Sequence, residues 1–167
     1  MFGWNDVFKF ILSFFIIFPV VTFIHLIGHI FFVAISGGTG KKIIIGCGKK
    51  MVSLWKIEIR KFYFMSGGCE FIKLRRDTKL NNSFIYLGGS LFNIISIFVV
   101  NFLIKEGVLE ASTFWYQFIY FSFYVVFFAL FPMDYADGSP SDGKAFWLNL
   151  KDKDNKFTDD IRRNSEY

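Results

Sequence analysis

The 167-residue sequence has only two cysteines and no linker between domains. The first feature argues against a disulfide-rich protein, and the second argues against a multidomain protein. Its two cysteines, Cys47 and Cys69, suit neither a disulfide framework nor a Cys-x-x-Cys zinc site. They could pair with each other, but we expect two separate buried thiols. The sequence has no internal repeat, no low-complexity linker and no room for a second domain. We therefore expect a single domain over residues 1–150 and a polar tail over residues 151–167.

Charge is absent from three long blocks. Residues 10–35, 81–104 and 111–133 contain no Asp, Glu, Lys or Arg, in a chain that is 53% hydrophobic and has 25 phenylalanines. Each block exceeds the roughly 20 residues that an α-helix needs to cross a bilayer. The first block is too long for a signal peptide and lacks a small-x-small cleavage site. We predict an all-α membrane protein with about three transmembrane helices, near residues 8–36, 84–104 and 112–132.

The basic residues are distributed unequally between the two sides of these spans. Lys9 and Lys105 fall on one side, whereas seventeen Lys and Arg fall on the other, in the segment 37–83 and in the tail. Because short loops rich in Lys and Arg stay in the cytoplasm, we expect a multi-pass protein of the cell membrane with its N-terminus outside and its C-terminus in the cytoplasm. The net charge of +5 then sets topology and does not indicate nucleic-acid binding.

The long segment between the first two helices has a strand pattern. Apolar and charged residues alternate from Trp55 to Arg60, which is typical of a half-buried strand. Residues 42–45 and 51–54 are candidate partner strands, and Ser66-Gly67-Gly68 is expected to end the run. We predict a small β-hairpin or sheet at the inner membrane surface, or dipping into it, because unpaired backbone is not tolerated in lipid.

Two histidines stand in the first predicted helix. His25 and His29 are four residues apart, so they lie on one face of the helix and can bind one metal ion. Such a pair can also serve packing, but polar groups inside a membrane are costly and usually face a functional site. Gly28 between them would let a neighbouring helix approach closely.

A second motif follows the third predicted helix. Asp142-Gly143 opens what reads as a helix at the membrane surface, and Asp142 can be either its cap or a ligand. The residue reaches the same depth and side of the membrane as the two histidines. Two His and one carboxylate are the ligands of zinc sites that keep one coordination position open. Asp137 is an alternative carboxylate.

These motifs resemble those of the site-2 proteases, which are intramembrane zinc metallopeptidases with three core helices. That family has H-E-x-x-H in its first core helix, and N-x-x-P followed by D-G at the end of its third. The matching residues are His25-Leu26-Ile27-Gly28-His29, then Ala129-Leu130-Phe131-Pro132, and Ser141-Asp142-Gly143. Residues 88–93 are similar to the family's stretch of small residues with Asn. The resemblance covers most of residues 15–150. It implies one Zn²⁺ on His25, His29 and Asp142, a position in the lipid bilayer, and a transmembrane peptide or protein as substrate.

Two polar positions of the family pattern are apolar in this chain. Leu26 stands where the family has the glutamate that takes a proton from the attacking water and passes it to the leaving amine. Ala129 stands where the family has asparagine. Glu70 is the best candidate for a substitute base, and Asp134 and Asp137 are alternatives. We expect a homologue that keeps the metal site and has weak or no peptidase activity.

Three other readings stay open at this point. The chain could be an active protease with a displaced base. It could be a non-enzymatic interaction or immunity protein that keeps the fold as a scaffold. A metal-ion carrier is disfavoured, because the second helix offers only Asn93, Ser96 and Asn101 as polar groups for a path across the membrane.

Overall fold

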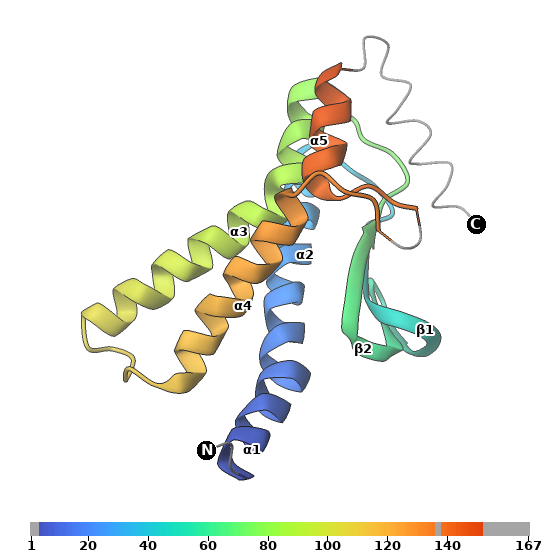
Figure 1. Ribbon diagram of the computed structural model, residues 1–167. Helices are drawn as coiled ribbons and strands as arrows, with labels where there is room; N and C mark the ends of the chain where they lie inside the picture. Colours follow the sequence, from blue (N-terminus) through green and yellow to red (C-terminus); the bar gives the residue numbers. More distant parts are fainter. Residues whose placement is uncertain (1–3, 136–137, 152–167) are drawn as a thin grey trace.

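Three helices are long and apolar enough to cross a membrane: Val7–Ile35, Lys79–Lys105 and Thr113–Leu130. The computed structural model describes residues 4–135 and 138–151. In Figure 1, α3 (Lys79–Lys105) and α4 (Thr113–Leu130) run side by side, and the β-sheet lies on the other side of α2 (Phe18–Ile35). The predicted three-helix arrangement with a sheet after the first helix is confirmed.

The first span consists of α1 (Trp4–Leu12), η1 (Ser13–Ile17) and α2, which follow one another without a break. Pro19 lies near the start of α2 and has no N–H to donate to the preceding turn. The chain widens into a π-helical turn just before it, where the Phe18 N–H bonds to the Ser13 carbonyl. The widened turn accommodates the proline, so the helix continues to His25 and His29.

Helix α3 begins at Lys79, earlier than the predicted start near residue 84. The Thr78 hydroxyl caps it by accepting a hydrogen bond from the Asn81 N–H at 3.3 Å. Because the first turn is polar, an apolar pattern could not reveal it. That turn has a structural use: the Asn149 side chain, from α5 (Asp142–Lys151), donates to the Lys79 carbonyl at 2.9 Å and to Ser83 Oγ at 3.0 Å.

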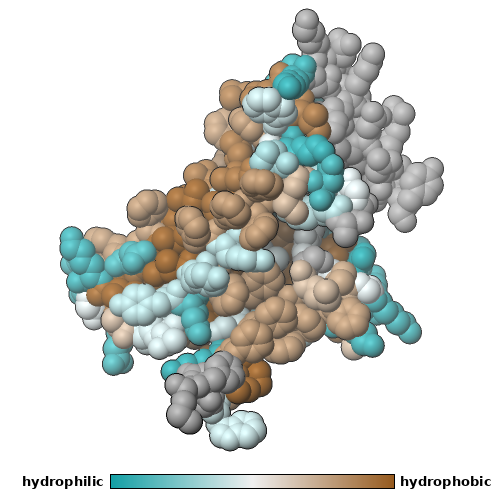
Figure 2. Space-filling view, in the orientation of Figure 1, coloured by the Kyte–Doolittle hydropathy of each residue, from teal (hydrophilic) through white to brown (hydrophobic). Residues whose placement is uncertain are grey.

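The outer surfaces of α3 and α4 are strongly apolar. Figure 2 shows brown side chains along this side of the molecule, and more than half of the surface of Phe98, Phe102, Phe123 and Phe127 is exposed. Monomeric soluble proteins rarely expose large contiguous apolar patches, so these exposed rings match a lipid environment. Inside, Ile17, Val21, Val100 and Phe118 form a buried cluster that joins the three spans.

Helices α2 and α3 touch through their backbones at two glycines. A Cβ built on Gly28 would lie 2.3 Å from the Gly88 carbonyl oxygen, and one built on Gly88 would lie 2.7 Å from the Gly28 carbonyl oxygen. Only residues without a side chain allow this approach, which is the usual device for close helix packing in membranes. The expectation of a close neighbour at Gly28 is confirmed.

The sheet is antiparallel and consists of β1 (Lys42–Leu54) and β2 (Ile57–Glu70). Leu54 pairs with Ile57 at the turn and Lys42 with Glu70 at the open end. Two expectations were wrong. Trp55 lies in the turn, at a φ of 49°, and not in a strand. Gly67 and Gly68 do not end the strand, because both pair with β1, and the lack of a side chain at Gly67 lets β2 lie against α2.

Strand β2 lies along α2 for much of its length. The Phe64 ring packs on Phe14 and Phe15 at centroid distances of 5.5 and 4.8 Å, and a Cβ on Gly67 would be 2.7 Å from Leu26 Cδ1. Twelve residues of helix correspond to about 18 Å. The hairpin therefore runs beside the first span over a considerable part of that helix's length. Cys47 and Cys69 are unpaired, as expected, but both are half-buried and not buried.

Glu58 links three cations across the sheet. Its carboxylate lies 2.6 Å from Lys42 Nζ, 2.9 Å from Arg60 Nε and 3.4 Å from Lys50 Nζ. Hydrogen bonds from Lys42 and Arg60 lower the pKa of Glu58 to about 2, so the carboxylate stays ionised at neutral pH. The lysine-rich strands are thus held together by a central negative charge.

Candidate metal centre

The two histidines of α2 lie one helical turn apart and are both buried. Their Nε2 atoms are 3.0 Å from each other, with ring centroids 4.7 Å apart. The four-residue spacing brings both rings to one face of α2, as predicted. Each ring presents Nε2, and not Nδ1, to the same point.

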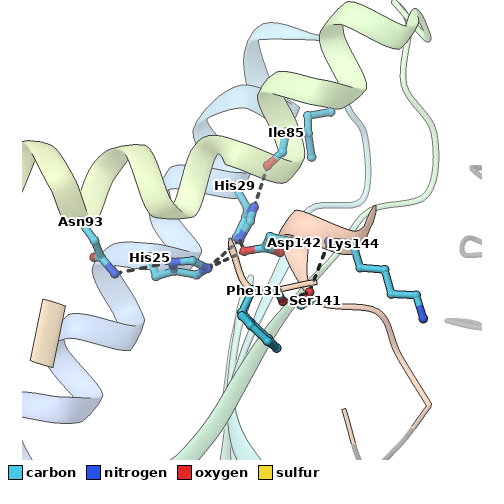
Figure 3. A network of polar contacts seen from close by, with 8 residues as sticks. All are labelled: His25, His29, Ile85, Asn93, Phe131, Ser141, Asp142 and Lys144. Atoms are coloured by element: carbon cyan, nitrogen blue, oxygen red, sulfur yellow. Dashed lines mark hydrogen bonds and ion pairs between the residues drawn. The ribbon is translucent and has the colours of Figure 1, made fainter. Parts of the chain in front are cut away.

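Asp142 joins them from the first turn of α5. Its Oδ2 atom lies 2.9 Å from His25 Nε2 and 3.3 Å from His29 Nε2, and Figure 3 shows the three side chains converging. These ligand atoms are all within 4.8 Å of one another. The structure therefore brings together the three residues that the sequence singled out, although 112 residues of chain lie between His29 and Asp142.

The position of Asp142 depends on its two neighbours. The buried Ser141 hydroxyl donates to the Phe131 carbonyl at 2.7 Å and accepts from the backbone N–H groups of Met133 and Lys144. A Cβ on Gly143 would lie 2.0 Å from the Leu130 carbonyl oxygen, so the start of α5 can sit on the end of α4 only with glycine there. The Ser141-Asp142-Gly143 sequence thus fixes the Asp142 carboxylate beside the two imidazole rings.

His29 is held in the tautomer that a metal ligand needs. Its Nδ1 lies 2.7 Å from the backbone carbonyl oxygen of Ile85, and a carbonyl can only accept a hydrogen bond. Nδ1 therefore carries the proton, and Nε2 keeps its lone pair free. A backbone carbonyl behind a histidine is a common way to orient a metal ligand.

Asp142 is an anionic group in this arrangement. Burial raises the pKa of its carboxyl, but the neighbouring imidazoles of His29 and His25 outweigh burial and hold that pKa well below its usual range. Burial raises the pKa of the nearby Cys69 thiol to about 12, so the thiol is neutral at pH 7. Its sulfur is not part of the group of ligand atoms formed by His25, His29 and Asp142.

The three atoms fit a small divalent ion. Tetrahedral bonds of about 2.0–2.1 Å place ligand atoms about 3.3 Å from one another. The separations of 2.9, 3.0 and 3.3 Å require only a small outward movement to reach that spacing. Two imidazole nitrogens and one carboxylate oxygen are also a donor set that zinc prefers.

Gly89 of α3 leaves room for such an ion. A Cβ built on this residue would lie 2.5 Å from Nε2 of His25 and 2.5 Å from Nε2 of His29. The side chain that is missing at Gly89 would therefore point into the space between the two ligand atoms. That space is kept open by the sequence.

A cavity of about 700 Å³ adjoins the three ligands. Its walls come from α2, α4, α5 and β2, and include Phe18, Tyr124, Phe128 and Gly68. Leu26 is buried, lines the same cavity and contacts β2 beside Gly67. Leu26 thus follows His25 in the cavity wall and offers no group that can carry a proton.

One relative gives the chain its family. It is 44% identical over 151 residues to the Bacillus subtilis (strain 168) protein named "Uncharacterized membrane protein YwmF", and the match covers 90% of this chain and 94% of that protein. The chain belongs to the YwmF family of membrane proteins. No family model and no solved structure matches it. Membership in the YwmF family, together with the three apolar helices, identifies a membrane protein.

Two of the candidate substitute bases, Glu70 and Asp134, are not among the residues that line the cavity of this YwmF-family protein. Glu70 ends β2 on the opposite face from Cys69 and pairs with Lys42, outside the cavity lining. Asp134 forms an ion pair with Lys144. Asp142 is the one carboxylate among the described residues that line the cavity, while Asp137 lies outside the described residues. The segment around Glu70 does lie at the site, since Gly67, Gly68, Cys69 and Phe71 line the cavity, but Glu70 itself is not among the lining residues.

Two features of the YwmF-family site were missed by reasoning from the sequence. The Ile85 carbonyl is a backbone group, so its role behind His29 leaves no mark on the residue type. Gly89 was noted only as part of the small-residue stretch 88–93, yet it faces the ligand atoms. The adjacent pair Gly88-Gly89 was a usable signal. One close helix contact needs only one glycine, so the second glycine indicates a further role.

Proposed function

We propose that the protein has a site-2-protease-like architecture, binds one Zn²⁺ through His25, His29 and Asp142, and has little or no peptidase activity. The observation that carries this proposal is the convergence of the three ligand atoms beside a cavity in which Leu26 replaces the catalytic carboxylate. When bound, zinc would supply Lewis-acid polarisation of a carbonyl group or of water.

Among the described residues that line the cavity, no carboxylate is free to move a proton. Asp142 is fully engaged with both histidines, and Leu26 is apolar. Peptide hydrolysis requires a group that moves a proton to the leaving amide nitrogen. General acid–base help is worth about 10²–10⁴-fold, or roughly 3–5 kcal/mol of barrier. Water is scarce in a membrane, so no solvent base compensates for this loss.

An apolar, partly aromatic cavity suits a transmembrane peptide as the ligand. Phe18, Tyr124, Val125 and Phe128 line it, and Ala129 adds no hydrogen-bonding group where the site-2 proteases have asparagine. The proposed site can therefore hold an apolar segment beside the metal but has lost a polar contact to the segment's backbone. Binding without cleavage is the activity we propose.

The test is to compare wild type with Leu26→Glu and with Leu26→Glu/Ala129→Asn on a panel of helical membrane peptides in detergent. We expect no cleavage by wild type and slow cleavage by the double variant. Leu26→Gln is the matched control, because it has the size and polarity of Glu but cannot act as a base. Robust cutting by wild type that a chelator stops and Glu70→Gln abolishes would show an ordinary protease with a displaced base.

The proposal includes an orientation, with the N-terminus outside and the C-terminus in the cytoplasm. It is supported by seventeen basic residues on one side of the spans and two on the other. A reporter fused after Tyr167 should read cytoplasmic, and one inserted at Gly107, in the turn between α3 and α4, should read external. If both reporters read the same side, the orientation and the proposed depth of the site are wrong.

A further inference from the structure

Asn93 is a buried amide in the middle of a membrane helix. It lies on α3, is 0% exposed, and its Nδ2 atom is 3.5 Å from Nδ1 of His25 (Figure 3). Its Oδ1 atom is buried and has no hydrogen-bond partner among the described residues. An unpaired amide oxygen in such a place is expensive, so its retention calls for a reason beyond packing.

The two histidines differ in what stands behind them. The Ile85 carbonyl fixes the proton of His29 on Nδ1, which leaves Nε2 free. The neighbour of Nδ1 in His25 is the Asn93 carboxamide. Because the Asn93 N–H is directed at Nδ1 of His25, that nitrogen is the acceptor. The His25 proton is then on Nε2, which lies 2.9 Å from Asp142 Oδ2. That tautomer of His25 cannot donate a lone pair from Nε2 to a metal ion.

A half-turn of the carboxamide reverses this preference. Rotation about the Cβ–Cγ bond exchanges Oδ1 and Nδ2, which have nearly the same shape. The oxygen that is unpaired in the present orientation then accepts a hydrogen bond from Nδ1–H of His25. Nε2 becomes a lone-pair donor, as it already is in His29.

We infer that Asn93 is the positioning residue of His25, and that its Oδ1 accepts the His25 Nδ1–H hydrogen bond in the metal-bound protein. The inference rests on the proposed metal site. It gives each histidine one acceptor behind it, a backbone carbonyl for His29 and a side-chain amide for His25. Such outer partners fix the ring and the tautomer, and their loss typically lowers metal affinity about 10–100-fold.

The experiment measures zinc affinity of the full chain in detergent by competition with a chromophoric chelator, for wild type, Asn93→Leu and Asn93→Asp. We expect Asn93→Leu to weaken binding by about 10–100-fold and Asn93→Asp, which keeps an acceptor oxygen, to restore most of it. Asn101→Leu is the matched control, because Asn101 is on the same helix, exposed, and bonded to the Ile97 carbonyl. It should bind zinc like wild type.

A second readout separates positioning from packing. In the zinc-loaded wild type, the Nδ1–H proton of labelled His25 should be shifted downfield and exchange slowly, and both properties should be lost in Asn93→Leu while the His29 signal is unchanged. Equal zinc affinity and an unchanged His25 signal in Asn93→Leu and Asn101→Leu would overturn the inference and leave the metal site standing. Absence of zinc binding by wild type would overturn the metal site, and the inference with it.

Discussion

Gly89→Ala is expected to abolish zinc binding although every ligand remains in place. The added Cβ would lie 2.5 Å from both Nε2 atoms, far inside van der Waals contact and close to the length of a metal–ligand bond of about 2.0–2.1 Å. The methyl group and the ion would thus compete for the same space. We expect an effect larger than the about 10–100-fold cost of removing an outer partner. Metal analysis of the purified variant measures it.

Gly68→Ala is the matched control for this substitution. Gly68 lines the same cavity, but a Cβ built on it meets no atom within 4 Å. The control should therefore keep its zinc and its thermal stability. Gly88→Ala should instead disturb the contact between α2 and α3, because its Cβ would meet the Gly28 carbonyl. A Gly89→Ala protein that is folded and fully loaded with zinc would contradict the proposed location of the ion.

Much of the fold follows from simple patterns in the sequence. The uncharged blocks predicted three spans because a bilayer requires about 20 apolar residues in each helix. The four-residue spacing placed His25 and His29 on one face, and the Asp142-Gly143 pair predicted the start of a surface helix, which is where α5 begins. These features depend on local geometry, so the sequence alone was sufficient.

Features that depend on neighbours in space were not predicted. Gly67 and Gly68 were expected to break a strand, but tertiary contact of β2 with α2 outweighs the low strand propensity of glycine. The early start of α3 depends on its contact with Asn149. Glu70 directly follows Cys69, which lines the cavity, yet strand alternation directs the Glu70 side chain to the opposite face.

Removal of any one ligand is expected to cause the second large effect. Apparent binding energies at structural zinc sites are about 10–16 kcal/mol, so the loss of one of three ligands should weaken binding by several kcal/mol. His25→Ala, His29→Ala and Asp142→Ala should each lose the ion. Asp134→Ala is the control, because Asp134 is an exposed carboxylate paired with Lys144.

The choice between two carboxylates is tested in the same series. Asp142→Ala should lose zinc and Asp137→Ala should keep it, because Asp142 Oδ2 is the oxygen that lies 2.9 and 3.3 Å from the imidazole nitrogens. The opposite result would mean that Asp137, and not Asp142, is the third ligand beside the two histidines.

The most direct test is the zinc content of the wild-type protein, purified from membranes without chelators, beside that of His29→Ala. His29 is the informative position, because its Nδ1 is already fixed by the Ile85 carbonyl and its Nε2 has no role in the proposed site other than to bind the ion. We predict one zinc ion per wild-type chain and none per chain of His29→Ala, with both proteins folded. Equal metal content in the two proteins would contradict the account.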